Sequence, residues 1–175
     1  MPIDNDLVQK STVLSRLTVE QLHRLAQVMK RKEYDAQSVI FEEGAAGDDM
    51  FFIEHGSVTI SKVIEGDVRT PLATFETGQC FGEMTLVDEM PRSATAIAEQ
   101  PTVLMSLTHN DFMDFMKTDP YGAAQFLTGV LWECNERLRH ANELLRDTIY
   151  WGMRAGGHLA IAKEEAKQED TQSLP

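Results

Sequence analysis

The chain has 175 residues, a formal net charge of -12 and 42% hydrophobic residues. This length suits one domain with an appendage or two very small ones, and the hydrophobic content is enough for a packed core. The acidic balance argues against a nucleic-acid partner, because phosphate backbones repel an acidic protein that has no strong basic patch.

The sequence carries no pattern typical of a metal centre, a catalytic centre or a membrane span. Its two cysteines, Cys80 and Cys134, lie far apart, and its five histidines lack metal-ligand spacing. No nucleophile–base arrangement is visible, and no apolar run approaches the roughly 18 residues that cross a bilayer. The first residues are polar and acidic, unlike a signal peptide. We therefore expect a cytoplasmic protein that is not an enzyme, holds no metal or cofactor and does not contact a membrane.

The first elements are predicted to be helical, from about residue 7 to residue 32. Thr18 and Gln21 have the spacing of a capping box, in which each side chain bonds the backbone N–H of the other residue. Leu22, Leu25 and Val28 then recur at helical spacing. This pattern predicts a short helical segment that packs on the domain that follows.

Between residues 33 and 107, short apolar runs alternate with turn residues. Val58, Ile60 and Val63 alternate with polar residues, which is the period of a strand with one buried face. The run 65–67, Glu-Gly-Asp, predicts a hairpin turn. Many short strands with regular turns favour a jelly-roll-like β-barrel. Together with the flanking helices this predicts an α+β fold.

Helical patterning returns after Leu107. Thr108 to Asp111 resembles a cap before a short helix, and Asp119-Pro120 ends that helix, since proline disfavours helical geometry in the residue before it. A longer helix is predicted for residues 121–150. Its heptad seam consists of Leu127, Leu131, Cys134, Leu138, Ala141, Leu145 and Thr148. The seam predicts a homodimer through a two-chain coiled coil; the alternative is that it packs on the chain's own β-domain.

The predicted organisation is a helical segment at 1–32, a β-barrel at 33–120, the long helix at 121–150 and a tail at 151–175. Glycines at 152, 156 and 157 predict a break and then a short extra helix. Residues 167–175 are predicted to be disordered. Too few residues follow the long helix for a winged helix-turn-helix, so we expect the effector to be either a separate protein or a domain outside this sequence.

One segment, Phe81 to Ala96, has the composition of an anion site. Gly82 allows a ligand to approach the backbone, and the following residues could form one helical turn whose free N–H groups suit an anion. Arg92 adds a planar cation that matches a phosphate. Glu83 would be repelled by a phosphate, but it could accept a hydrogen bond from a sugar hydroxyl. On composition alone, a Glu83–Arg92 surface salt bridge closing a loop remains an equal alternative.

The segment resembles the phosphate-binding cassette of cyclic-nucleotide-binding domains, as found in bacterial catabolite-activator-like regulators. The family pattern is Phe-Gly-Glu-(apolar)-(small)-Leu, a variable stretch and Pro-Arg-(small)-Ala-Thr. Residues 81–86 and 91–95 match it, and residues 40–53 and 56–58 resemble the family's strand–turn–strand signature. The matching glycines are Gly44, Gly47, Gly56, Gly78 and Gly82. The resemblance spans residues 15 to 149 and is far more specific than a lone glycine motif.

The resemblance implies a role for each matching residue. Glu83 would hold the ribose 2′-hydroxyl, and Arg92 the exocyclic phosphate oxygens. Further ligand-binding residues of the cassette would be Gly82, Met84, Thr85, Ser93 and Ala94. An apolar wall around the sugar and base would be formed by Ile60, Leu72 and Ala73. Arg137 and Leu138 on the long helix would cover the base, although Asn135, Asn142 or Trp132 could serve instead.

The resemblance implies a sensor or regulatory module whose ligand is cAMP, with cGMP as the other candidate. A serine after the cassette arginine contacts phosphate in bacterial cAMP-binding activators, whereas a hydroxyl there can contact guanine in cGMP-selective members. Binding would move the C-terminal helix and thereby alter a dimer or partner interface. The alternatives are a barrel-fold interaction protein that binds no nucleotide and a metal-dependent enzyme on a similar barrel, which would need a histidine cluster.

Overall fold

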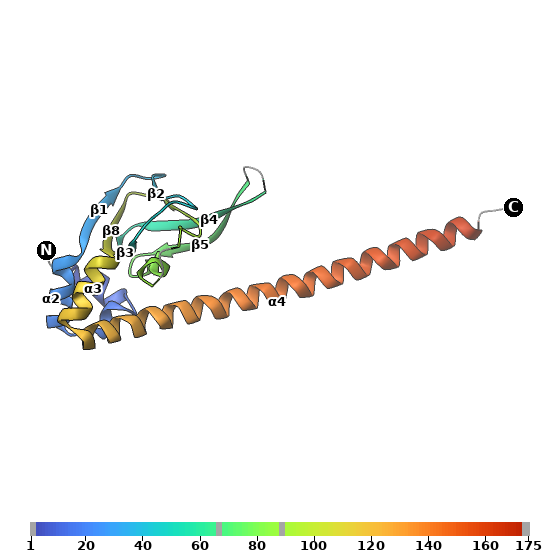
Figure 1. Ribbon diagram of the computed structural model, residues 1–175. Helices are drawn as coiled ribbons and strands as arrows, with labels where there is room; N and C mark the ends of the chain where they lie inside the picture. The colour runs from blue at the N-terminus through green and yellow to red at the C-terminus, as the bar shows by residue number, and fades with distance from the viewer. Residues whose placement is uncertain (1–2, 66–67, 88–89, 173–175) are drawn as a thin grey trace. The chain divides into compact units, whose positions relative to one another are not determined.

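The computed structural model describes residues 3–65, 68–87 and 90–172. It contains two four-stranded antiparallel sheets, preceded by short helices and followed by a long one (Figure 1). The chain divides into two compact units, Met1–Glu133 and Cys134–Pro175. The described strands all lie in the first unit. This confirms the predicted α+β fold with a jelly-roll-like β-domain, N-terminal helices and a long C-terminal helix.

The N-terminal segment is broken into short helices instead of one helical stretch. It comprises α1 (Asn5–Lys10), the 3-10 helix η1 (Leu14–Arg16) and α2 (Val19–Val28). The capping box predicted at Thr18 and Gln21 is present at the start of α2. The helical structure ends at Val28. Residues 30–32, which were predicted to be helical, instead lie in strand β1 (Lys30–Tyr34), which pairs with β8.

The first sheet has the order β1-β8-β3-β6 and the second the order β2-β7-β4-β5. The remaining strands are β2 (Val39–Phe41), β3 (Asp49–His55), β4 (Ser57–Glu65), β5 (Val68–Glu76), β6 (Cys80–Phe81), β7 (Thr95–Ala98) and β8 (Thr102–Thr108). Pro71 lies in β5, which is an edge strand, where a missing N–H breaks no ladder. The predicted turn at 65–67 falls mostly on residues 66–67, outside the described residues.

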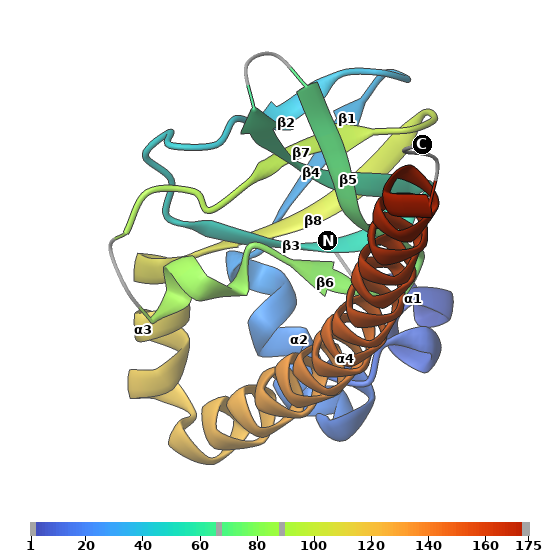
Figure 2. The same cartoon turned by 90° about the vertical axis from the view of Figure 1, so that its right-hand side faces the viewer.

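Strand β3 is buried on both faces and separates two parts of the core. Successive side chains of a strand point to opposite faces. Phe51 and Ile53 belong to a cluster with residues of the second sheet, including Val58 and Ala96. Phe52 instead contacts the helical side, with its ring 5.9 Å from that of Phe126. Figure 2 shows α2 and α3 (His109–Thr118) on one side of the β3–β8 sheet and β4, β5 and β7 on the other.

The last helix, α4, runs from Pro120 to Gln172 without the predicted break and separate short helix. Its start matches the sequence, because Asp119 is non-helical and accepts from the Gly122 N–H at 2.8 Å, with proline in the first helical position. The glycines after Ile149 do not end the helix. A glycine costs a helix only about 1 kcal/mol relative to alanine. The helix also includes most of the tail predicted to be disordered, and residues 173–175 lie outside the described residues.

Candidate functional site

The cassette segment turns sharply where β6 ends. Gly82 follows Phe81 with a φ of 74°, a left-handed conformation that glycine adopts without strain. It begins the single-turn 3-10 helix η2 (Glu83–Leu86), which contacts β3 and α3 (Figure 2). A Cβ at Gly82 would lie 3.0 Å from Nη1 of Arg92 and 3.3 Å from the Asp49 carbonyl oxygen. The sequence therefore needs glycine here both for the turn and for the close approach of Arg92.

Arg92 lies in the interior of the domain and not on its surface. Its N–H donates to the Ala45 carbonyl and its carbonyl accepts from Gly44, so the loop before β3 holds its backbone. Its side chain is 3% exposed, and its Nη2 lies 2.6 Å from Oδ1 of Asp49. The guanidinium carbon stacks 4.2 Å from the centre of the Phe41 ring. A buried guanidinium paired with Asp49 does not fit the alternative interpretation, in which Arg92 forms a surface salt bridge with Glu83.

One donor of this buried guanidinium has no acceptor. Nε of Arg92 is buried and has no hydrogen-bond partner. Leaving a buried polar group unpaired costs about 1–3 kcal/mol, and more for a charged group. Burial lowers the pKa of Arg92, and the charge and hydrogen bond of Asp49 oppose that shift. An arginine keeps its proton in proteins, so Arg92 is a fixed cation whose buried Nε has no acceptor among the described protein atoms.

Asp49 links the cassette to the first sheet. Its Oδ2 accepts from Nζ of Lys32 on β1 at 2.8 Å, while its Oδ1 accepts from Arg92. Asp49 shares a face of β3 with Phe51, because residues two apart in a strand point the same way. The carboxylate is therefore shared between two cations. This contact network was not predicted from the sequence, where Asp49 stood only as part of the upstream signature.

Gly47 leaves the space that the Arg92 side chain occupies. A Cβ at Gly47 would lie 2.5 Å from Nε and 2.8 Å from the guanidinium carbon of Arg92. Real Cβ atoms do not approach that closely, so a side chain there must displace Arg92. The sequence predicted Gly47 as a matching glycine but not for this reason.

Gly47→Ala is accordingly expected to weaken binding of an anionic ligand at Arg92 by at least about tenfold, because a displaced guanidinium loses charge-assisted bonds. Calorimetric titration of the purified variant measures this. Gly152→Ala is the matched control, since a Cβ there meets nothing within 4 Å. Equal affinities of Gly47→Ala and the wild type would contradict the steric role of Gly47.

The other predicted cassette residues lie around this arginine in different states of exposure. Glu83 is half-buried, Met84 and Ser93 are exposed, and Ala94 is buried. Ser93 Oγ lies 3.9 Å from the Met84 sulfur, which brings the two ends of the cassette together. Thr85 is 5% exposed and its hydroxyl bonds the protein itself, and its contact with a ligand remains a prediction. The segment around η2 and Arg92 contains all the predicted cassette residues, namely Gly82, Glu83, Met84, Thr85, Arg92, Ser93 and Ala94.

The predicted apolar wall lies on the second sheet. Ile60 on β4 pairs with Ala73 on β5 and with Ala96 on β7. Leu72 is 56% exposed, whereas Ile60 packs partly on the core cluster that contains Phe81. These positions remain predictions for ligand contact. Arg137 and Leu138 belong to the second unit, so their part in covering a base also stays a prediction.

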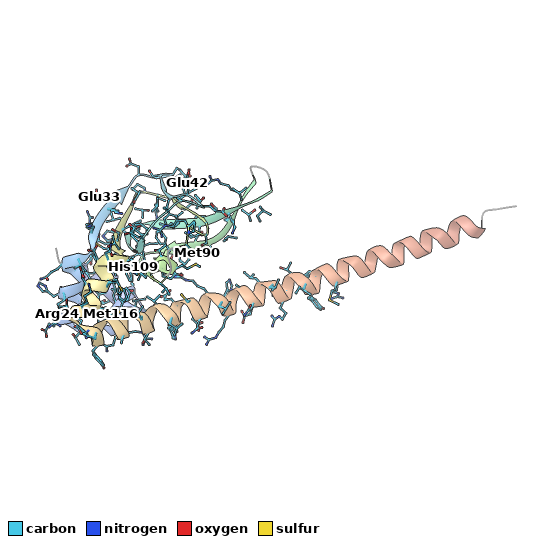
Figure 3. All side chains as sticks on the ribbon, viewed as in Figure 1. Arg24, Glu33, Glu42, Met90, His109 and Met116 are labelled. Atoms are coloured by element: carbon cyan, nitrogen blue, oxygen red, sulfur yellow. The ribbon has the colours of Figure 1, made fainter. Side chains whose placement is uncertain are left out.

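A cavity of about 560 Å³ borders the cassette on the side of α3. It is lined by Ala46, Gly47, Asp48, Thr85, Pro91, His109 and Asn110. His109 Nδ1 lies 3.0 Å from the Leu86 carbonyl oxygen and joins the start of α3 to η2; Figure 3 labels His109 at that position. Among the described residues, no group of three or more histidine, cysteine or acidic side chains could hold a metal ion. In the same ranges, no helix has the length and apolar character to cross a membrane.

Comparison with known proteins supports the resemblance. The family model of the cyclic nucleotide-binding domain matches residues 31–119. A cAMP-dependent protein kinase regulatory subunit of Aspergillus fumigatus is 28% identical over 66% of this chain and 29% of that protein. A cGMP-dependent protein kinase isozyme of Drosophila melanogaster is 34% identical over 52% of this chain and 12% of that protein.

A solved structure agrees with the architecture. The crystal structure of the Thermus thermophilus catabolite activator protein has a TM-score of 0.67 and 30% identity, covering 77% of this chain and 62% of that chain. The matched region therefore spans less than two thirds of each of these relatives. The family model covers half of this chain, including both sheets from Arg31 onward and the cassette with its buried arginine. The chain belongs to the cyclic nucleotide-binding domain family.

Proposed function

We propose that this domain is a regulatory module that binds cAMP, with Arg92 holding the cyclic phosphate and Glu83 the ribose 2′-hydroxyl. The observation that carries the proposal is the buried Arg92 guanidinium, whose Nε lacks an acceptor. A phosphate oxygen is an acceptor of matching charge, and its bonds to a guanidinium are about twice as strong as neutral ones. The fixed cation supplies affinity, while the Phe41 ring and the shared Asp49 contact its face and its Nη2.

Burial raises the strength of this recognition. Coulomb attraction grows as water is excluded, so a guanidinium at 3% exposure attracts a phosphate more strongly than a surface arginine does. Asp49 carries one negative charge between the two cations Lys32 and Arg92. One net positive charge therefore remains in this group of three to attract an anion.

Ser93, which follows Arg92 and lies exposed at the cassette, bears on the choice between cAMP and cGMP. A hydroxyl in this place can donate to a phosphate oxygen and so add a contact to the cyclic phosphate. The same hydroxyl could serve a guanine, and the curated relatives include both a cAMP-dependent and a cGMP-dependent kinase. Titration with both nucleotides separates the two ligands.

The deciding experiment is isothermal titration of the full chain with cAMP, cGMP and 5′-AMP, the last of which has an open phosphate. We expect cAMP to bind more tightly than cGMP and 5′-AMP to bind weakly. Titration of Glu83→Ala with cAMP and 2′-deoxy-cAMP then tests the ribose contact. The variant should bind the two ligands equally, whereas the wild type should prefer cAMP. No heat and no thermal shift at millimolar cAMP and cGMP would overturn the proposal.

The proposed output is a change at the long helix. The seam leucines Leu131, Leu138 and Leu145 are 61%, 60% and 58% exposed on α4, which is unusual for a row of large apolar side chains on one face. A second copy covering this seam would form a homodimer, and cAMP binding would alter it or the surface for a separate effector.

Light scattering of the full chain with and without cAMP tests the dimer. We expect a dimer mass for the wild type and a monomer mass for Leu138→Glu, which places a charge in the seam. Arg139→Glu makes the neighbouring residue acidic outside the seam and serves as the control. A monomeric wild type under both conditions would refute the dimer.

A further inference from the structure

Thr85 provides a buried hydroxyl within the cassette, next to Arg92. It lies in η2 and is 5% exposed. Its Oγ1 is 2.9 Å from the Gly82 carbonyl oxygen, 3.2 Å from the Asp49 carbonyl oxygen and 3.5 Å from Nη1 of Arg92. A hydroxyl has one proton to donate and two lone pairs that accept. Because the proton is used on a carbonyl, the lone pairs remain for the arginine.

The two terminal nitrogens and the planar face of the Arg92 guanidinium have different contacts. Asp49 accepts from Nη2, and the Phe41 ring covers the face of the group. Nη1 lies between Gly82, which has no side chain to exclude it, and the hydroxyl of Thr85. With the contacts from Asp49 and Phe41 alone, the guanidinium plane could still rotate about the hydrogen bond between Nη2 and Asp49. The Thr85 hydroxyl opposes that rotation from the opposite nitrogen.

We propose that Thr85 is a positioning residue, whose hydroxyl fixes the orientation of Arg92 for the phosphate. This inference rests on the proposed function. The burial of Thr85 supports it, and so does the single hydroxyl proton, which has two backbone carbonyls within reach and leaves the lone pairs for Arg92. Rigid positioning of a binding group raises affinity because less orientational freedom is lost on binding.

The test compares variants that keep or remove the hydroxyl. Thr85→Val has nearly the same shape and lacks the acceptor, Thr85→Ala lacks it with less bulk, and Thr85→Ser retains it. Calorimetric titration with cAMP should show about fivefold weaker binding for Thr85→Val and Thr85→Ala, and a change of less than about twofold for Thr85→Ser. Thr128→Val is the control, because Thr128 is exposed on α4 and its hydroxyl donates to the Ala124 carbonyl.

A double-variant cycle separates positioning from a general loss of stability. If Thr85 acts through Arg92, Thr85→Val should have little further effect on cAMP affinity in an Arg92→Lys background. Wild-type affinity in Thr85→Val and Thr85→Ala would overturn the inference, and so would an equal loss from Thr85→Val in both backgrounds. Absence of cAMP and cGMP binding by the wild type would instead overturn the proposed function, so the two failures are distinguishable.

Discussion

Arg92→Ala is expected to weaken cAMP binding at least tenfold. The substitution removes the fixed cation and with it charge-assisted hydrogen bonds that are worth about 1.5–3 kcal/mol each. Each 1.4 kcal/mol corresponds to about a tenfold change in the dissociation constant. Titration calorimetry with cAMP on the wild type and the variant gives the ratio directly.

The variant should still fold, which keeps the measurement interpretable. Removing one partner of a buried ion pair usually leaves an uncompensated charge. Here Asp49 keeps Nζ of Lys32 at 2.8 Å, so its carboxylate stays paired. A thermal melt without nucleotide monitors this point.

Arg24→Ala is the matched control for charge. Arg24 lies on α2 and pairs with Glu20 and Asp119, and Figure 3 labels it at the helical end of the domain. The Arg24→Ala substitution should reduce the stability of the domain slightly and leave its cAMP affinity unchanged. An affinity of Arg92→Ala within about twofold of the wild type would show that Arg92 is not the phosphate ligand.

The sequence was sufficient for elements whose signals are local. The capping box at Thr18, the cap at Thr108 and the end of α3 at Asp119 are all present, because each depends on residues within one helical turn. Alternation of Val58 and Ile60 identified β4 in the same way. The local pattern misled at the glycines inside α4 and at residues 30–32, which lie in β1 and not in a helix.

The site was predictable only in part, for a similar reason. Glu83 and Arg92 could be singled out as candidates because both belong to one contiguous motif. The contacts that hold Arg92 come from β2, β3 and the loop between them, through Phe41, Asp49 and Gly47. Such contacts depend on how strands that are distant in sequence pair and pack. The strand register cannot be read from a single sequence, and an acidic residue two positions after a glycine has no distinctive spacing.

Thr85 shows the remaining difficulty. Its place in the motif suggested direct contact with a ligand, as for its neighbours. A hydroxyl can equally bond the backbone of its own turn, and Thr85 Oγ1 lies 2.9 Å from the Gly82 carbonyl three residues earlier. The motif alone does not distinguish these uses. The backbone contact became visible only with the packing of η2 on β3, which buries the side chain.

Phe126→Ala is expected to produce the largest loss of stability, about 3–5 kcal/mol in the free energy of unfolding. Phe126 on α4 is fully buried, with its ring 5.9 Å from that of Phe52 on β3 and 5.3 Å from that of Phe112 on α3. It therefore joins the first turns of α4 to a strand and to another helix. Alanine removes these contacts and leaves a cavity that the three elements cannot fully close.

Urea denaturation followed by circular dichroism measures the loss as a lower midpoint. Phe126→Leu should lose less, because leucine keeps most of the buried apolar volume. Tyr121→Ala, an exposed aromatic on the same helix, should change stability by less than about 0.5 kcal/mol. A loss below about 1 kcal/mol for Phe126→Ala would mean that the start of α4 is not anchored through this ring. The proposed output through α4 requires that anchor, because a helix can respond to the cassette only if its first turns are held by β3 and α3.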